Sequence, residues 1–186
     1  MRPSPSSESS RPRIYLAGPD VFFRDSDARF ARLQAACEAL DMVGVPPSDG
    51  DMAADFSGSD DERAQRIYEG NVALIRSADG VLANLENFRG QEPDSGTVFE
   101  VGFAVALGKP VVGYGVAPGT YAERIAAALP CTQDDGGTTR EAATGTMVEG
   151  LGQRLNLMLT RSTGLASSAE EALAWLARRV GSAAHR

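Results

Sequence analysis

Three acidic residues, Glu92, Asp94 and Glu100, lie at the start of a segment with helical apolar spacing, residues 97–108. A carboxylate on the first turn of a helix lies in the positive field of the helix N-terminus, so it stays ionised and can act as a nucleophile. A second carboxylate in the preceding loop can pass a proton to a leaving group. Two carboxyl groups about 5 Å apart are the arrangement that retaining glycosyl transfer requires.

A structural explanation of the same residues is the commoner one for this spacing at helix starts. Thr97 and Glu100 fit the S/T-x-x-E pattern of a capping box, in which Glu100 folds back to the backbone N–H of Thr97. Asp94 and Glu92 would then be loop acids that favour the positive end of the helix. Spacing alone leaves both interpretations open.

The composition limits the classes of partner. A chain of 186 residues with 42% hydrophobic content can bury one core, so we expect a single domain. The net charge is −7, and Lys109 is the only lysine, so binding of nucleic acid through a basic face is not expected. No apolar run reaches membrane-spanning length or resembles a signal sequence, which predicts a soluble, cytoplasmic protein without membrane contact.

The other reactive residue types are sparse. Cys37 and Cys131 have no metal-ligand spacing, and Cys37 falls in a helical apolar pattern that predicts a buried side chain. The single histidine, His185, lies beside the C-terminus, which argues against catalytic triads and histidine metal sites. The sequence also has no Walker loop, GxGxxG fingerprint or metal-ligand cluster, so neither a cofactor nor a metal is expected.

The elements that must position the acidic residues alternate between strands and helices. Residues 1–12, rich in Pro and Ser, are expected to form a disordered tail, and residues 13–182 a single domain. Apolar runs predict strands at 14–18, 42–47, 80–86 and 110–115, and helical spacing predicts helices at 25–40, 62–77 and 97–108. This order indicates an α/β fold with a doubly wound, Rossmann- or flavodoxin-like parallel sheet and flanking helices. Ligands of such sheets bind beyond the carboxyl ends of the strands, here near residues 18–23, 48–61 and 86–95.

The C-terminal third is harder to assign. Residues 121–129 have helical spacing, residues 131–145 are expected to form an exposed insertion, and residues 145–162 are apolar at helical spacing. A last helix is predicted over 167–180, with Ser168 and Glu171 as a capping box and Trp175 in packing or in an oligomer contact.

Four motifs occur in a fixed order along the chain: IYLAGP, NVALIRSADGVLANL, DSGTVFEVGFAVALGKPVV and the tripeptide at 156–158. In this combination, residues 14–158 resemble the nucleoside 2-deoxyribosyltransferases and their nucleotide N-glycosidase relatives. The resemblance implies that Glu100 is a nucleophile forming a covalent deoxyribosyl ester, that Asp94 binds the base and assists its protonation, and that Tyr15 orients Glu100. It also implies that Asn156 reaches the sugar 5′-hydroxyl of a neighbouring subunit, and therefore a homo-oligomer.

The chain departs from this family in two places. Asn71 stands where transferases commonly carry an aspartate, eight residues before Asp79, and an amide both donates and accepts hydrogen bonds. The preference between purines and pyrimidines is therefore left open. The chain also continues well past Asn156, whereas family members often end near the site with a carboxylate, so Arg186 receives no role.

The remaining candidates for substrate binding follow the first strand or open the acidic helix: Gly18, Asp20, Phe22, Ser95 and Gly96. Each has a structural alternative. Phe22 can stack on a base or pack in the core, Tyr15 can be an ordinary buried strand residue, and Asn156 can cap its own helix.

The leading hypothesis is a transferase that moves 2-deoxyribose between nucleobases, with nucleosides and bases as its small-molecule partners. One alternative is an N-glycosidase that hydrolyses nucleoside 5′-monophosphates. Those hydrolases often carry a serine six residues before the glutamate, whereas Asp94 here would repel a phosphate, although Ser95 is only one place later. Another alternative is a non-catalytic nucleotide-binding module, which would keep its ligand when Glu100 is replaced by Ala.

Overall fold

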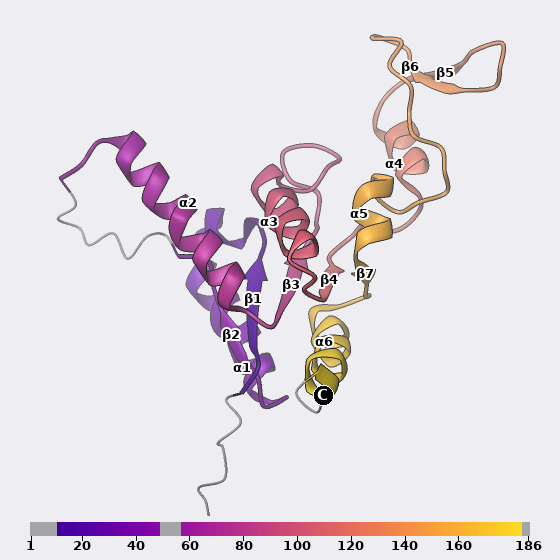
Figure 1. Ribbon diagram of the computed structural model, residues 1–186. Coiled ribbons are helices and arrows are strands. Elements are labelled where there is room, and N and C mark those ends of the chain that lie inside the picture. The colour runs from indigo at the N-terminus through magenta and orange to yellow at the C-terminus, as the bar shows by residue number, and fades with distance from the viewer. Residues whose placement is uncertain (1–10, 49–56, 184–186) are drawn as a thin grey trace, which may run out of the picture.

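The computed structural model describes residues 11–48 and 57–183 of the chain. The expected N-terminal tail therefore lies outside the described residues except for residues 11 and 12, as does most of the loop expected at 48–61. Five parallel strands form the central sheet in the order β2-β1-β3-β4-β7. Their bounds are Arg13–Ala17 (β1), Val43–Val45 (β2), Gly80–Asn84 (β3), Val111–Tyr114 (β4) and Gly164–Leu165 (β7). The predicted α/β fold with a parallel sheet is confirmed (Figure 1).

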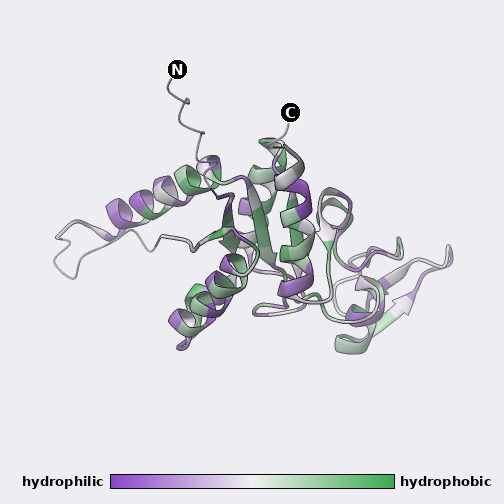
Figure 2. Ribbon diagram, turned by 90° about the horizontal axis from the view of Figure 1, so that it is seen from below, coloured by the Kyte–Doolittle hydropathy of each residue, from purple (hydrophilic) through white to green (hydrophobic). Residues whose placement is uncertain are grey.

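Helices cover both faces of the sheet. The helices α2 (Asp60–Ser77) and α3 (Ser95–Ala106) pack on one face, and α1 (Ser26–Glu38) and α6 (Ala169–Ala183) on the other. The strands between them are largely hydrophobic (Figure 2). The strand residues alternate accordingly. Tyr15 and Ala17 join the core beneath α2 and α3, whereas Ile14 and Leu16 join the core beneath α1 and α6. Because both faces are covered, the strands read as continuous apolar runs in the sequence.

The sheet order creates a switch point beside β1. Strand β1 pairs with β2 along one side and with β3 along the other. The chain therefore crosses from one side of β1 to the other between β2 and β3. The short 3-10 helix η1 (Pro19–Phe22) follows β1 directly, and the loop from Leu85 to Asp94 follows β3. Such a crevice at the carboxyl ends of the strands is where ligands bind in open α/β sheets.

Most of the apolar face predicted for helix α1 is confirmed. Phe30, Leu33 and Cys37 pack against the core, whereas Leu40 lies beyond the end of the helix and is 39% exposed. Burial raises the pKa of the Cys37 thiol to about 11, so the buried, inert cysteine expected from the pattern is confirmed.

The helix predicted over 145–162 is wrong for most of its length. Only α5 (Leu157–Ser162) is helical there, because Gly145 and Gly152 adopt positive φ angles of 71° and 69°, which interrupt a right-handed helix. The predicted helix near 121 is α4 (Tyr121–Ala128). The expected exposed insertion is an antiparallel pair, β5 (Cys131–Gln133) and β6 (Thr139–Glu141), which lies away from the sheet (Figure 1).

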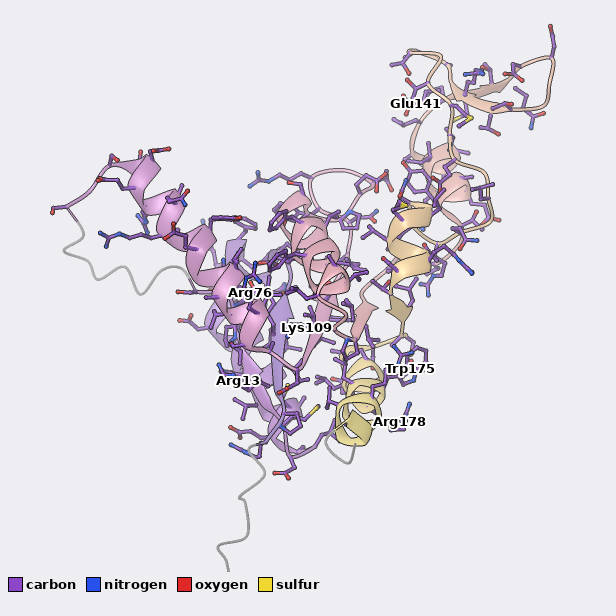
Figure 3. The ribbon with its side chains drawn as sticks, in the orientation of Figure 1. Arg13, Arg76, Lys109, Glu141, Trp175 and Arg178 are labelled. Atoms are coloured by element: carbon purple, nitrogen blue, oxygen red, sulfur yellow. The ribbon has the colours of Figure 1, made fainter. Side chains whose placement is uncertain are left out.

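Two side chains labelled in Figure 3 stabilise the ends of elements. The Lys109 ammonium donates to the carbonyl groups of Arg76 and Ala78 at the C-terminal end of α2, where a positive charge is favoured. Trp175 packs against Gly164 in β7, so its predicted packing role is confirmed.

The cap of the last helix, α6, differs by one residue from the predicted one. The Glu171 amide donates to Ser168 Oγ, but the Glu171 carboxylate accepts from Ser167, so the predicted reciprocal capping box is shifted by one residue. No helix in the described ranges is both long and apolar enough to cross a membrane.

Candidate active site

A cavity of about 330 Å³ opens beyond the carboxyl end of β1, on the face of the sheet that α2 and α3 cover. It is lined by η1, the end of β2, α2 and α3, through Gly18, Val21, Phe22, Pro47, Ser48, Ile67, Asn71, Asp94, Gly96, Thr97 and Glu100. Two carboxylates and no basic side chain are among these residues. The cavity therefore favours neutral or cationic ligands over anions.

Tyr15 does not line the cavity but contacts Glu100, which does. The Tyr15 hydroxyl donates to Glu100 Oε1 at 2.5 Å, joining residues that are 85 positions apart in the sequence. Tyr15 is fully buried in β1, and burial together with the neighbouring carboxylate raises the pKa of its hydroxyl well above the ordinary value. The phenol therefore keeps its proton and acts only as a donor to Glu100.

The carboxyl group of Glu100 has an unusual proton affinity. Burial raises its pKa to about 7, the negative charge of Asp94 adds to this rise, and the hydrogen bond from Tyr15 opposes it. The expectation that a helix N-terminus keeps Glu100 ionised is thus wrong. Because α3 begins at Ser95, Glu100 lies on the second turn, where the helix field has fallen off.

Asp94 is the N-cap of α3. Its Oδ2 accepts from the Thr97 backbone N–H at 2.9 Å and from the Thr97 hydroxyl at 3.1 Å. The capping box considered for Thr97 and Glu100 is therefore absent, since Thr97 is already inside the helix. Asp94 Oδ1 accepts no hydrogen bond from the described part of the chain, and the residue lines the cavity, so this oxygen is free to contact a ligand.

Asn71 approaches the same cavity from α2. Its Oδ1 accepts from the backbone N–H of Ser48 at 2.8 Å, which ties α2 to the chain that follows β2. Gly18, Phe22 and Gly96 also line the cavity, and Phe22 is 59% exposed at its rim. Core packing therefore does not account for the Phe22 ring.

The structure places three of the candidate substrate-binding residues outside this cavity. Ser95 is exposed at the first position of α3 and is not among the lining residues. Asn156 is the N-cap of α5, where its Oδ1 accepts from Met158 N, and it lines a second cavity of about 450 Å³ on the far side of α3. Within the chain, then, Asn156 and Glu100 do not meet.

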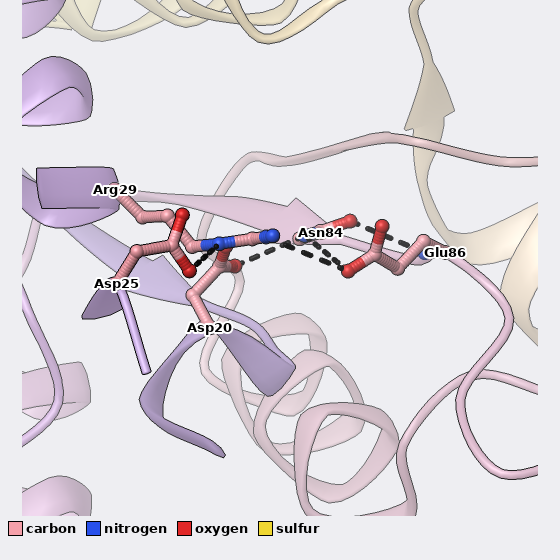
Figure 4. Close-up of polar contacts among 5 residues, drawn as sticks. All are labelled: Asp20, Asp25, Arg29, Asn84 and Glu86. Atoms are coloured by element: carbon pink, nitrogen blue, oxygen red, sulfur yellow. Dashed lines mark hydrogen bonds and ion pairs between the residues drawn. The ribbon is translucent and has the colours of Figure 1, made fainter. Parts of the chain in front are cut away.

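Asp20 is the third of these residues and lies in a buried polar network behind the cavity wall (Figure 4). Its Oδ1 accepts from Arg29 and its Oδ2 from Asn84, the last residue of β3. Arg29 also bonds the exposed Asp25. The network holds η1 against the ends of β1 and β3. The i,i+4 spacing of Asp25 and Arg29 indicates their ion pair in the sequence, but no sequence pattern indicates the bond from Arg29 to Asp20.

Sequence reasoning missed two residues at the rim. Phe88 stacks on Phe22 with ring centroids 5.3 Å apart, and the Arg89 guanidinium lies over both rings. Arg89 has a φ of 54°, which a residue with a side chain rarely adopts. These contacts join the loop that carries Asp94 to the turn that carries Phe22.

Comparison with known proteins agrees with this geometry. The family model for nucleoside 2-deoxyribosyltransferase matches residues 14–158. A 2-desoxiribosyltransferase from Leishmania mexicana is similar in structure, with 32% sequence identity and a TM-score of 0.70 over 90% of this chain and 97% of that chain. A conserved protein from Enterococcus faecalis V583 shares the fold, with 22% identity and a TM-score of 0.58 over 91% of this chain and 99% of that chain.

A curated relative is similar over a shorter stretch. The uncharacterized protein C191.05c of Schizosaccharomyces pombe is 31% identical over 115 residues, which are 61% of this chain and 54% of the relative. The chain thus spans about half the length of that relative. The family match covers most of the chain and includes every residue that lines the cavity. The chain therefore belongs to the nucleoside 2-deoxyribosyltransferase family.

Proposed function

We propose that the protein transfers 2-deoxyribose from one nucleobase to another through a covalent ester on Glu100. The observation that carries this proposal is the Tyr15 to Glu100 hydrogen bond inside a cavity that Asp94 also lines. Tyr15 fixes Oε1, which leaves Oε2 to attack the anomeric carbon of the donor. The bond between this carbon and the base breaks, the electron pair leaves with the base, and a proton from solvent, passed through the Asp94 carboxylate, neutralises it.

The second half-reaction reverses these steps. A nitrogen of the incoming base attacks the anomeric carbon, the ester bond breaks, and Glu100 recovers its carboxylate while Asp94 accepts the proton of the attacking base. Two inversions give net retention of configuration. The burial that raises the Glu100 pKa also favours the neutral ester over the charged carboxylate, so the same environment stabilises the intermediate.

The charges of the cavity support nucleosides over nucleoside 5′-monophosphates as donors. Asp94 and Glu100 are its charged lining residues, and no described lining residue is Arg or Lys. A phosphate group would be repelled by both carboxylates and would lack a cationic partner. Hydrolysis of monophosphates, the runner-up activity, receives no comparable support from these residues.

A second copy of the chain is proposed to complete the site. The outer face of α3 exposes apolar surface, with Phe99 50% exposed and Gly102 open to solvent, and a helix that is apolar all round is normally covered. Asn156 borders the cavity beside this face. A homo-oligomer formed there would bring Asn156 to the sugar 5′-hydroxyl in the neighbouring site. The cytoplasmic location expected from the sequence stays a prediction.

Chromatography of the reaction products tests the proposal. The protein is incubated with 2′-deoxyuridine or 2′-deoxyadenosine, each with and without hypoxanthine, and in parallel with 2′-deoxyuridine 5′-monophosphate. Formation of 2′-deoxyinosine that requires both donor and acceptor is expected. Uracil released from the monophosphate alone would favour the hydrolase, and an absence of products from every donor would favour the binding module. Glu100→Gln should abolish exchange, whereas Glu38→Gln, the same change at an exposed position of α1, should preserve it.

A further inference from the structure

The side chain of Asn156 is exposed at the start of α5, yet its amide is held from two sides. Its Oδ1 accepts from the backbone N–H of Met158 at 3.0 Å, and its Nδ2 donates to Oε2 of Glu149 at 3.1 Å. A backbone N–H can only donate and a carboxylate can only accept, so rotating the amide by half a turn would lose both bonds. The surroundings of Asn156 therefore allow one orientation of its amide.

The Glu149 carboxylate uses both of its oxygen atoms in this arrangement. Oε2 accepts from Asn156, and Oε1 accepts from the backbone N–H of Leu157, the first residue of α5, at 2.7 Å. In Glu149→Gln, an NH2 group would replace one of these oxygens, so one of the two donors would face another donor. An acidic side chain is therefore better suited than its amide to hold the start of α5 and the Asn156 side chain together.

Glu149 is itself anchored by the hairpin of β5 and β6. It is half-buried and directly follows Val148, which is buried and whose backbone N–H donates to the Thr139 carbonyl in β6 at 2.9 Å. The hairpin lies away from the sheet, and none of its described residues lines the Glu100 cavity (Figure 1). It therefore supports the segment that carries Glu149 rather than the cavity of its own chain.

We infer that Glu149 is a positioning residue, which acts through Asn156 on the 5′-hydroxyl group of a donor in the neighbouring subunit's site. The inference rests on the proposed function, because that function places Asn156 at this hydroxyl group. A freely rotating asparagine would lose freedom when the donor binds, which lowers affinity, whereas Glu149 removes this freedom beforehand. Within the described residues, one N–H of Nδ2 and one lone pair of Oδ1 remain for the hydroxyl group.

Two donors that differ by one oxygen atom test this inference. Base exchange with hypoxanthine is measured as kcat/KM for 2′-deoxyadenosine and for 2′,5′-dideoxyadenosine, and in parallel for 2′-deoxyuridine and 2′,5′-dideoxyuridine. Glu149→Ala should lower kcat/KM about tenfold for the donor with the 5′-hydroxyl group and less than about twofold for the donor without it. A damaged fold would lower both values equally, so equal losses, or no loss, would overturn the inference.

A double-mutant cycle tests the same inference with the hydroxyl-bearing donor alone. Because Glu149 acts through Asn156, the double variant Glu149→Ala/Asn156→Ala should be no slower than Asn156→Ala. Losses that multiply would show that Glu149 acts by another route, and would overturn the inference. The control is Glu141→Ala, which removes a carboxylate of the same hairpin that accepts from Thr144, and it should leave kcat/KM for both donors unchanged. A donor-dependent loss in this control as large as that in Glu149→Ala would also overturn the inference.

Turnover by the wild-type protein separates this inference from the proposed function. Wild-type base exchange, together with a Glu149→Ala loss that ignores the 5′-hydroxyl group, would sink the inference and keep the proposed reaction. An absence of wild-type exchange from every donor would refute the proposed reaction and the inference with it.

Discussion

Replacement of Tyr15 by Phe removes one hydroxyl group and should change the pH dependence of the reaction. In the structure this hydroxyl donates to Glu100 and is the one contact that lowers the pKa of the carboxyl group, which burial and Asp94 raise to about 7. Without the hydroxyl, both remaining influences favour the protonated, non-nucleophilic form. The acidic limb of the activity profile should therefore move to higher pH.

The size of the shift follows from the strength of the lost bond. A hydrogen bond to a charged group contributes about 1.5–3 kcal/mol, and about 1.4 kcal/mol corresponds to one pH unit. The pKa of Glu100 in Tyr15→Phe should therefore rise by about one to two pH units. At pH 7 the ionised fraction would fall from about one half to between about one tenth and one hundredth, lowering kcat/KM about fivefold to fiftyfold.

The assay is the ratio of kcat/KM between Tyr15→Phe and wild type from pH 5.5 to 10, since kcat/KM reports ionisations of the free enzyme. The ratio cancels titration of the donor itself. It should be lowest at acidic pH and rise through pH 7–9. Tyr114→Phe, the same deletion in β4 on the opposite face of the sheet, should give a flat ratio. A flat ratio for Tyr15→Phe would refute this account of how Glu100 is tuned.

Two further predictions concern the free energy of unfolding. Because burial raises the pKa of Glu100 from 4.5 to about 7, ionised Glu100 destabilises the fold above pH 7, and this penalty disappears as the pH falls to 4.5. Glu100→Gln should therefore stabilise the protein by up to about 3 kcal/mol at pH 8 and by little at pH 4, measured by urea unfolding; equal effects at both pH values would contradict this. Asp20→Ala removes the buried carboxylate that accepts from both Arg29 and Asn84, and should cost about 1–3 kcal/mol. The exposed Asp25→Ala should have little effect, and similar losses from both changes would argue against a stabilising network at Asp20.

Much of the fold could be predicted because its signals are local. The central strands are apolar without interruption and end in Gly, Pro or Asn, and the helices between them repeat apolar residues every three or four positions. Covered on both faces, these strands leave one consistent solution, a parallel sheet. The helix predicted over 145–162 is wrong for most of its length, because apolar spacing does not report that Gly145 and Gly152 adopt left-handed conformations.

The start of α3 could not be decided from sequence. Asp94 and Thr97 are both favourable N-cap residues, and each has a plausible partner three positions later. In the structure Asp94 is the N-cap, so Glu100 lies on the second turn of the helix and not at a capping position, and it contacts Tyr15. The raised pKa of Glu100 follows from that burial, which no local pattern encodes.

Contacts between distant segments are the other feature of the site that could not be predicted from the sequence. The pairing of Tyr15 with Glu100 was expected only through resemblance to a family, because 85 residues separate them. Asp20 was expected at the ligand, yet it bonds Arg29 and Asn84 behind the wall. A carboxylate after a strand has the same appearance in sequence whether it faces a ligand or a buried guanidinium.

In the proposed reaction, Glu100 carries the sugar between two bases. The most direct test incubates the protein with 2′-deoxyinosine in the absence of an acceptor base, quenches in acid within the first turnover, and maps the digested protein by mass spectrometry. We expect one deoxyribosyl group on the peptide that contains Glu100, lost when uracil is added before the quench and absent in Glu100→Gln. Base exchange that proceeds with no adduct, or an adduct on another residue, would contradict it.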